Sequence, residues 1–182
     1  DDVDDDDRRR VAGEIAEDLG TVSSRCRGTS DGARAHLTAF RRSSSIYTLM
    51  SLLGVVSIPS DGGDGAFGRR EEEEEVLRAT CRTLTSLLTP IAPSSSSSSS
   101  SAAAVAAING VKDGLRDSFV AFERLVGLMA RCVDAIECGS SDAAAEAAAA
   151  RTTLAELTRL ATAACARCEG NKVSFVRARA RG

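Results

Sequence analysis

The chain has 182 residues, a net charge of −3 and 43% hydrophobic residues, with no Trp, one Tyr and five Phe. A single domain of this length buries roughly 70% of its unfolded surface, and the core must be built from Leu, Val, Ile, Ala and Cys. The composition excludes a membrane span, because the most apolar window, residues 46–58, is shorter than the roughly 20 residues a bilayer requires. Direct nucleic-acid binding is also not expected, since the balance of charge is acidic.

Six Asp lie in the first seven residues, so residues 1–10 are predicted to form an acidic disordered tail. A first helix follows and ends near Ser24, because apolar residues recur there at helical spacing. These residues are Val11, Ile15, Leu19 and Val22.

A second helix is predicted from Asp31, which with Ser30 is a good N-cap, to Ile58, where Pro59 stops it. Four Gly within residues 60–68 then indicate a loop. The loop is not a phosphate-binding loop, since no strand precedes it and no Gly-Lys-Ser/Thr sequence follows it.

A third helix is predicted from the Glu run at residues 71–75 to Ile91, with Pro90 and Pro93 at its end. It carries a heptad-like apolar stripe, which also suggests an alternative role as a subunit of a larger coiled-coil or bundle assembly. The stripe consists of Leu77, Cys81, Leu84, Leu88 and Ile91. Eight Ser follow, and residues 92–103 are predicted to be a disordered low-complexity linker.

Two long amphipathic helices are predicted after the linker, over residues 105–137 and 142–168, joined by a tight turn. An alternative for the first of them is a break near Gly110 or Gly114. Gly170 and Asn171 are expected to end the last helix, and residues 171–182 to form a basic tail or the start of a further element. The predicted fold class is therefore an all-α antiparallel bundle of about five helices, with residues 11–170 as one domain.

The chain offers no constellation typical of an enzyme. His36 is the only His, and it is expected on a helix surface. The carboxylates occur in charged runs and not singly among apolar residues, so acid–base pairs are not indicated. We therefore predict a protein that is not an enzyme and that has no cofactor.

The six Cys are expected to be reduced core residues of an intracellular protein. The alternative is a zinc-binding helical module, in which Cys165 and Cys168 are joined by Cys132 and Cys138, since four thiolates can bind zinc. Structural zinc sites usually take such pairs from turns, whereas this pair is predicted on a helix. Arg41 and Arg42 before Ser43–Ser45 also fit a site for a basophilic kinase.

The segment Val126-Gly127-Leu128-Met129-Ala130-Arg131-Cys132, followed by a short polar turn and an Ala-rich helix with Leu154, Glu156 and Leu157, resembles the N-terminal helical domain of the cyclin-D-binding protein family. The earlier predicted helices follow in the same order. The chain has Leu128, Met129 and Arg131 where that family tends to have Val, Trp and Ala, and its turn lacks the expected Pro.

The resemblance implies a helical adaptor that binds a D-type cyclin or a helix-loop-helix regulator, restrains cell-cycle progression and transcription, and is distributed between cytoplasm and nucleus. It also implies that Gly127, Met129 and Cys132 are packing residues of the fold. We expect the recognition surface on the outer faces of the last two helices, and not between them.

Overall fold

The computed structural model describes residues 2–26, 31–42, 45–55, 71–89, 98–117, 121–137 and 144–181. These residues contain helices and no strand, which confirms the predicted all-α fold class, although eight helices replace the five expected. The helices are α1 (Asp2–Cys26), α2 (Asp31–Arg42), α3 (Ser45–Val55), α4 (Glu71–Leu88), α5 (Ser98–Asp117), α6 (Ala121–Glu137), α7 (Ala144–Cys165) and α8 (Glu169–Arg181). None of the described helices is both long and apolar enough to cross a bilayer.

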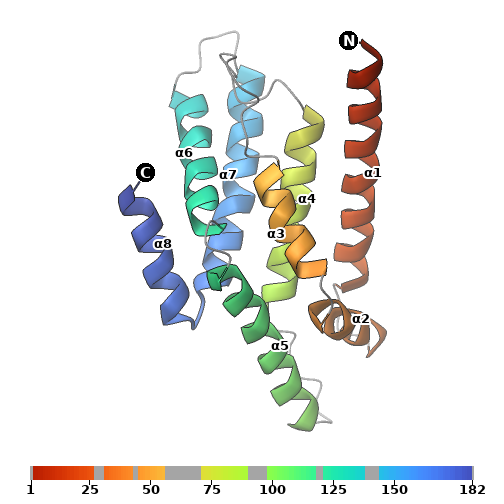
Figure 1. Cartoon of the computed structure of the whole chain (residues 1–182), viewed down its shortest axis with the longest axis vertical. Coiled ribbons are helices and arrows are strands. Elements are labelled where there is room, and N and C mark those ends of the chain that lie inside the picture. Colours follow the sequence, from red (N-terminus) through yellow and green to blue (C-terminus); the bar gives the residue numbers. More distant parts are fainter. Residues whose placement is uncertain are drawn as a thin grey trace.

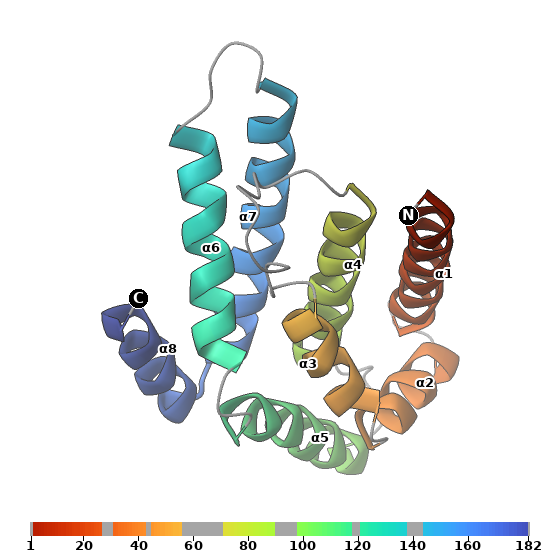
Figure 2. The same cartoon turned by 45° about the horizontal axis from the view of Figure 1, so that its top comes forward.

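Five helices stand side by side in a row, in the order α1, α4, α7, α6, α8 (Figure 1). The other three helices pack against this row. α3 packs on α4 and α6, while α5 crosses beneath the row and contacts α2 and α8 (Figure 2). The two ends of the chain therefore lie at opposite edges of the molecule, on α1 and α8.

One hydrophobic cluster includes side chains from helices on both sides of the serine run. Leu77, Leu84 and Leu87 of α4 are almost completely buried, as are Leu157 and Leu160 of α7. Because α4 has α1 on one side and α7 on the other, the part of the heptad-like stripe that the structure describes, which excludes Ile91, is covered by helices of the same chain. The stripe that suggested a coiled assembly is thus used inside this molecule.

The start of α1 differs from the prediction, since Asp2–Arg10 are helical and do not form a disordered tail. Acidic residues in the first turn of a helix interact favourably with the helix dipole. Arg10 also bridges Asp7 and Glu14 at 3.2 Å each, the spacing at which charged side chains support a helix. The extension of α1 over residues 2–10 could not be predicted from apolar periodicity, because this segment contains almost no apolar residues.

The predicted second helix is two helices, α2 and α3. Leu37 of α2 and Leu49 and Leu53 of α3 are all buried, but α2 packs mainly on α1 and α5, whereas α3 packs mainly on α4 and α6. One straight helix could not serve both sets of neighbours. Residues 56–70, which include the end of the predicted helix and the glycine loop, lie outside the described part of the chain.

The predicted fourth helix is also divided, into α5 and α6, and the division lies after Asp117 and not at Gly110 or Gly114. A continuous helix over residues 105–137 would be about 50 Å long, against about 33 Å for α7 beside it. In addition, α5 begins at Ser98, so the second half of the expected linker is helical.

The end of the chain is a helix in its own right. α7 ends at Cys165, a short turn follows, and α8 includes Gly170 and Asn171, which were expected to terminate the preceding helix. Arg167 provides the left-handed backbone conformation at this helix end, with φ 53°, a role more often taken by Gly.

Candidate functional site

The structure separates the cysteines that were considered as zinc ligands. Cys165 and Cys168 flank the turn between α7 and α8, at the lower end of the row. Cys132 lies in α6, about 16 Å of helix rise from the start of that helix, and is completely buried. Among the described residues no group of three or more His, Cys, Asp or Glu side chains is placed to hold a metal ion. Cys138 lies outside the described residues.

The thiols of Cys81 in α4 and Cys132 in α6 are both completely buried. Burial raises the pKa of Cys81, and with smaller contributions from the nearby Glu156 and Cys132 the pKa reaches about 12. Burial likewise raises the pKa of Cys132 to about 12, with Glu74 as the next cause. Both side chains are therefore neutral, inert thiols at neutral pH.

The three residues expected to pack within the predicted fourth helix have different surroundings. Cys132 is buried and Met129 is half-buried against the same core, but Gly127 is exposed, with open space where a Cβ would lie. Gly127 and Cys132 are five residues apart, about 1.4 turns, so they lie on different faces of α6. The expectation that Gly127 is a packing residue is wrong.

A line of ion pairs joins α4 to α7. Arg78 contacts Glu74 at 3.2 Å and Glu75 at 3.0 Å, and Arg82 contacts Glu75 at 2.9 Å. Arg82 also approaches Glu156 of α7 at 4.0 Å. The acidic run that starts α4 is thus partly engaged in the fold, and the half-buried part of it is neutralised by arginines.

A polar joint holds α5, α7 and α8 together, and sequence reasoning missed it. The ammonium group of Lys112, which is buried in α5, donates a hydrogen bond to the carbonyl of Ala166 at the end of α7. The fully buried Asn171 donates through Nδ2 to the carbonyls of Lys112, at 3.2 Å, and Ala164, at 3.0 Å. Carbonyls at a helix end lack intrahelical partners, and these side chains supply partners to the carbonyls of Ala164 and Ala166 at the end of α7. The only sequence signal was a Lys within an apolar stripe.

One face of α8 fastens it to the bundle. Phe175 packs edge-on against Phe122 of α6, with ring centroids 6.2 Å apart and an interplanar angle of 85°. Arg181 pairs with Glu123 at 2.8 Å, and Ala178 is buried. The rings and the ion pair fix both the position and the orientation of α8 on α6.

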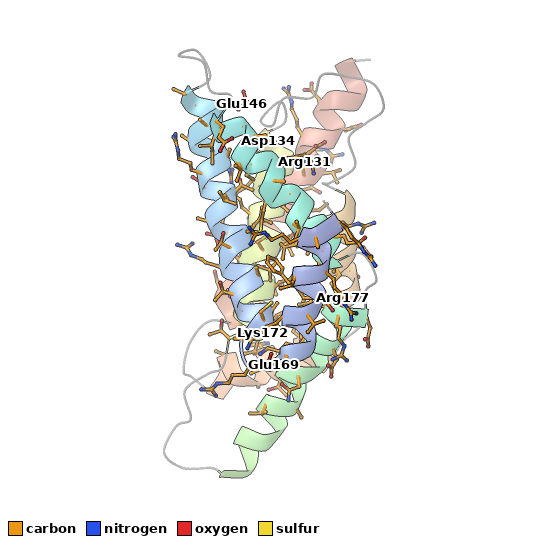
Figure 3. All side chains as sticks on the ribbon, turned by 90° about the vertical axis from the view of Figure 1, so that its left-hand side faces the viewer. Arg131, Asp134, Glu146, Glu169, Lys172 and Arg177 are labelled. Carbon is orange, nitrogen blue, oxygen red and sulfur yellow. The ribbon has the colours of Figure 1, made fainter. Side chains whose placement is uncertain are left out.

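The opposite face of α8 is exposed, and we refer to Val173, Val176 and Ala180 as the outer stripe of α8. Val176 is 65% exposed and Val173 48%. Figure 3 looks onto this side of the molecule, with α8 in front of α6 and α7. Helical spacing places basic residues on both flanks of the stripe, which are Lys172 and Arg179 on one side and Arg177 and Arg181 on the other.

His36 is exposed on α2, at a distance along the chain and in space from α8. The Arg41–Ser45 segment lies partly outside the described residues. Comparison of the chain with protein-family models, with curated proteins and with solved structures finds no match.

Proposed function

We propose that this chain is a non-enzymatic helical protein-interaction protein and that it binds its partner through the outer stripe of α8. Following the family resemblance of its sequence, we propose a D-type cyclin or a helix-loop-helix regulator of cell-cycle progression and transcription as the partner, met in the cytoplasm or nucleus. The exposed outer stripe of α8 is the observation that carries the proposal.

The outer stripe has the chemistry of a helix-docking surface. Two exposed valines and an alanine form a narrow apolar strip, and small side chains allow another helix to approach closely. Arg179 on one flank and Arg177 on the other favour a partner helix whose apolar strip is bordered by Asp or Glu. Lys172 and Arg181 on the same flanks already pair with Glu169 and Glu123 of this chain. An acidic amphipathic helix therefore fits this surface better than a basic or uncharged one.

The polar side chains elsewhere support a binding role over a catalytic one. The buried Glu74 carboxylate pairs with Arg78, and the buried Lys112 ammonium is bonded to a backbone carbonyl. His36 is on the surface of α2, with no second His in the chain. The Glu74 carboxylate is thus engaged within α4, and the Lys112 ammonium joins α5 to the end of α7.

The test is a pull-down with the full chain against a purified D-type cyclin and a helix-loop-helix protein. Val176→Asp places a carboxylate in the centre of the stripe, and we expect it to abolish retention. Val11→Asp is the matched control, because Val11 is also an exposed valine, 45% accessible, but lies on α1 at the far edge of the row. We expect this control to bind normally.

Circular dichroism on both variants confirms that they are folded before binding is compared. Failure of the folded parent to retain either partner would overturn the assignment of partner. Equal retention by the Val176 and Val11 variants would overturn the outer stripe as the contact surface.

A further inference from the structure

We propose that Cys165 and Cys168 form a redox-active dithiol that exchanges with low-molecular-weight disulfides such as glutathione disulfide, and that closes to an intramolecular disulfide across the turn between α7 and α8. The proposal concerns a modification site and does not depend on the identity of a binding partner.

The turn brings the two cysteines to a suitable separation. The backbone N–H of Cys168 donates to the carbonyl of Cys165 at 3.2 Å, which closes a four-residue turn. The first and last Cα atoms of such a turn lie within about 7 Å. A disulfide spans Cα atoms about 4.4–6.8 Å apart, so the separation across this turn is compatible with the bond.

The turn is held in place from both sides, so the dithiol is preorganised. Lys112 bonds to Ala166, inside the turn, and Asn171 bonds to Ala164, immediately before it. Arg167 has its left-handed conformation between the two cysteines. Movement of α8 away from α7 would break these contacts, which keeps the two thiols together in the reduced protein.

The surroundings of the pair differ from those of the other described cysteines. Cys165 and Cys168 are half-buried, whereas Cys26, Cys81 and Cys132 are buried. Burial raises the pKa of Cys165, followed in effect by the adjacent Cys168, while Lys172 and Lys112 lower it. The two lysines oppose this increase only in part, and what distinguishes the pair from the three buried thiols is that solvent reaches the turn.

Exchange begins at Cys168, because burial disfavours the thiolate of Cys165. The Cys168 thiolate attacks one sulfur of glutathione disulfide, the S–S bond breaks, and one glutathione thiolate leaves and takes up a proton from solvent. Cys165 then loses its proton and attacks Cys168 Sγ in the mixed disulfide, which releases the second glutathione. The net reaction converts the protein dithiol and one glutathione disulfide into the protein disulfide and two glutathione molecules.

The experiment incubates the full chain with glutathione disulfide, blocks free thiols with iodoacetamide and maps each cysteine by mass spectrometry. A Cys138→Ser background restricts the result to the described cysteines. We expect a Cys165–Cys168 disulfide that dithiothreitol reverses, with Cys26, Cys81 and Cys132 still reduced.

Single variants separate the two steps. Cys165→Ser should accumulate glutathione on Cys168, because the resolving thiol is missing. Cys168→Ser should react more slowly than the parent, because burial raises the pKa of its remaining thiol, Cys165. Cys132→Ser is the matched control and should leave the disulfide unchanged. Hydrogen exchange on the oxidised and reduced parent adds a readout on the native fold, with slower exchange expected in the first turn of α8 after oxidation.

Two results would overturn the proposal. One is a parent chain that accumulates glutathione on Cys168 without closing the intramolecular bond. The other is modification of the buried cysteines at the same rate as Cys165 and Cys168, which would mean that the turn confers no selectivity.

Discussion

The buried side chain of Asn171 joins α8 to both α5 and α7 through two hydrogen bonds. Asn171→Ala removes both hydrogen bonds and leaves two buried carbonyl groups without this donor. We expect the free energy of unfolding to fall by about 1–3 kcal/mol, measured by urea denaturation. Val173→Ala, two residues away on the exposed face, is the control and should change stability little. Equal losses for the two variants would contradict the role assigned to the joint.

The buried thiols make stability depend on alkaline pH. The pKa of Cys81 is raised from 9.0 to about 12 by burial, so the unfolded chain loses this proton before the folded chain does. The stabilisation is complete below pH 9 and is lost as the pH rises toward 12, with a slope of about 1.4 kcal/mol per pH unit for one thiol.

Urea denaturation of the parent and of Cys81→Ala at a series of pH values between 8 and 11 checks this effect. We expect a shallower pH dependence in the variant. Leu84→Ala, at an equally buried position of α4 without a titrating group, should keep the slope of the parent. The idea fails if the two variants show the same slope.

The buried polar residues were the hardest features to predict from sequence. Lys112 lies between Val111 and Leu115, where periodicity gave no reason for a buried charge, and its partner is the backbone of Ala166, 54 residues away. Asn171 follows Gly170, and a Gly-Asn pair is typical of the residues that end a helix. Each residue takes its role from a tertiary contact, which local sequence patterns do not encode.

At the scale of helices, substitution of two glycines by Ala is predicted to stabilise the protein to different extents. Gly127 lies inside α6 with open space at its Cβ position, so Gly127→Ala should stabilise the protein by about 0.5–1 kcal/mol. A Cβ on Gly170 in α8 would lie 3.1 Å from the Arg116 guanidinium and 3.3 Å from its Cδ. Gly170→Ala should therefore gain less, because Arg116 must move. Thermal unfolding of the two variants gives the comparison, and a greater gain for Gly170→Ala would contradict the packing described.

The helical character of most segments was predictable from the sequence, whereas the residues at which the helices begin and end were not. The apolar stripe of residues 105–137 keeps its spacing through the region where α5 gives way to α6, so periodicity alone favours one long helix. The division follows from the sizes and directions of the neighbouring helices. For the same reason the outer faces of the last two predicted helices were expected to carry the recognition surface, whereas the proposed surface lies on α8, in residues expected to form a basic tail or the start of a further element.

For the whole molecule, the common core predicts cooperative unfolding across the serine run. Leu87 in α4 is completely buried in the same cluster as Leu157 in α7. Leu87→Ala should lower the free energy of unfolding by about 2–5 kcal/mol and reduce hydrogen-exchange protection in α1, α4, α6 and α7 together. Val133→Ala, on the exposed side of α6, is the control. Loss of protection confined to the helices before the serine run would show two independent units.

The row of helices also separates charge. α1 at one edge carries eight acidic and four basic residues, and α8 at the other edge carries four basic residues and one acidic residue. The molecule therefore has an electric dipole directed across its width, which turns the α8 edge toward a negatively charged body before contact is made. Such orientation acts on the rate of encounter and weakens as salt shortens the Debye length to about 10 Å at 0.1 M. Ionic strength should thus slow association with an acidic partner more than it hastens dissociation.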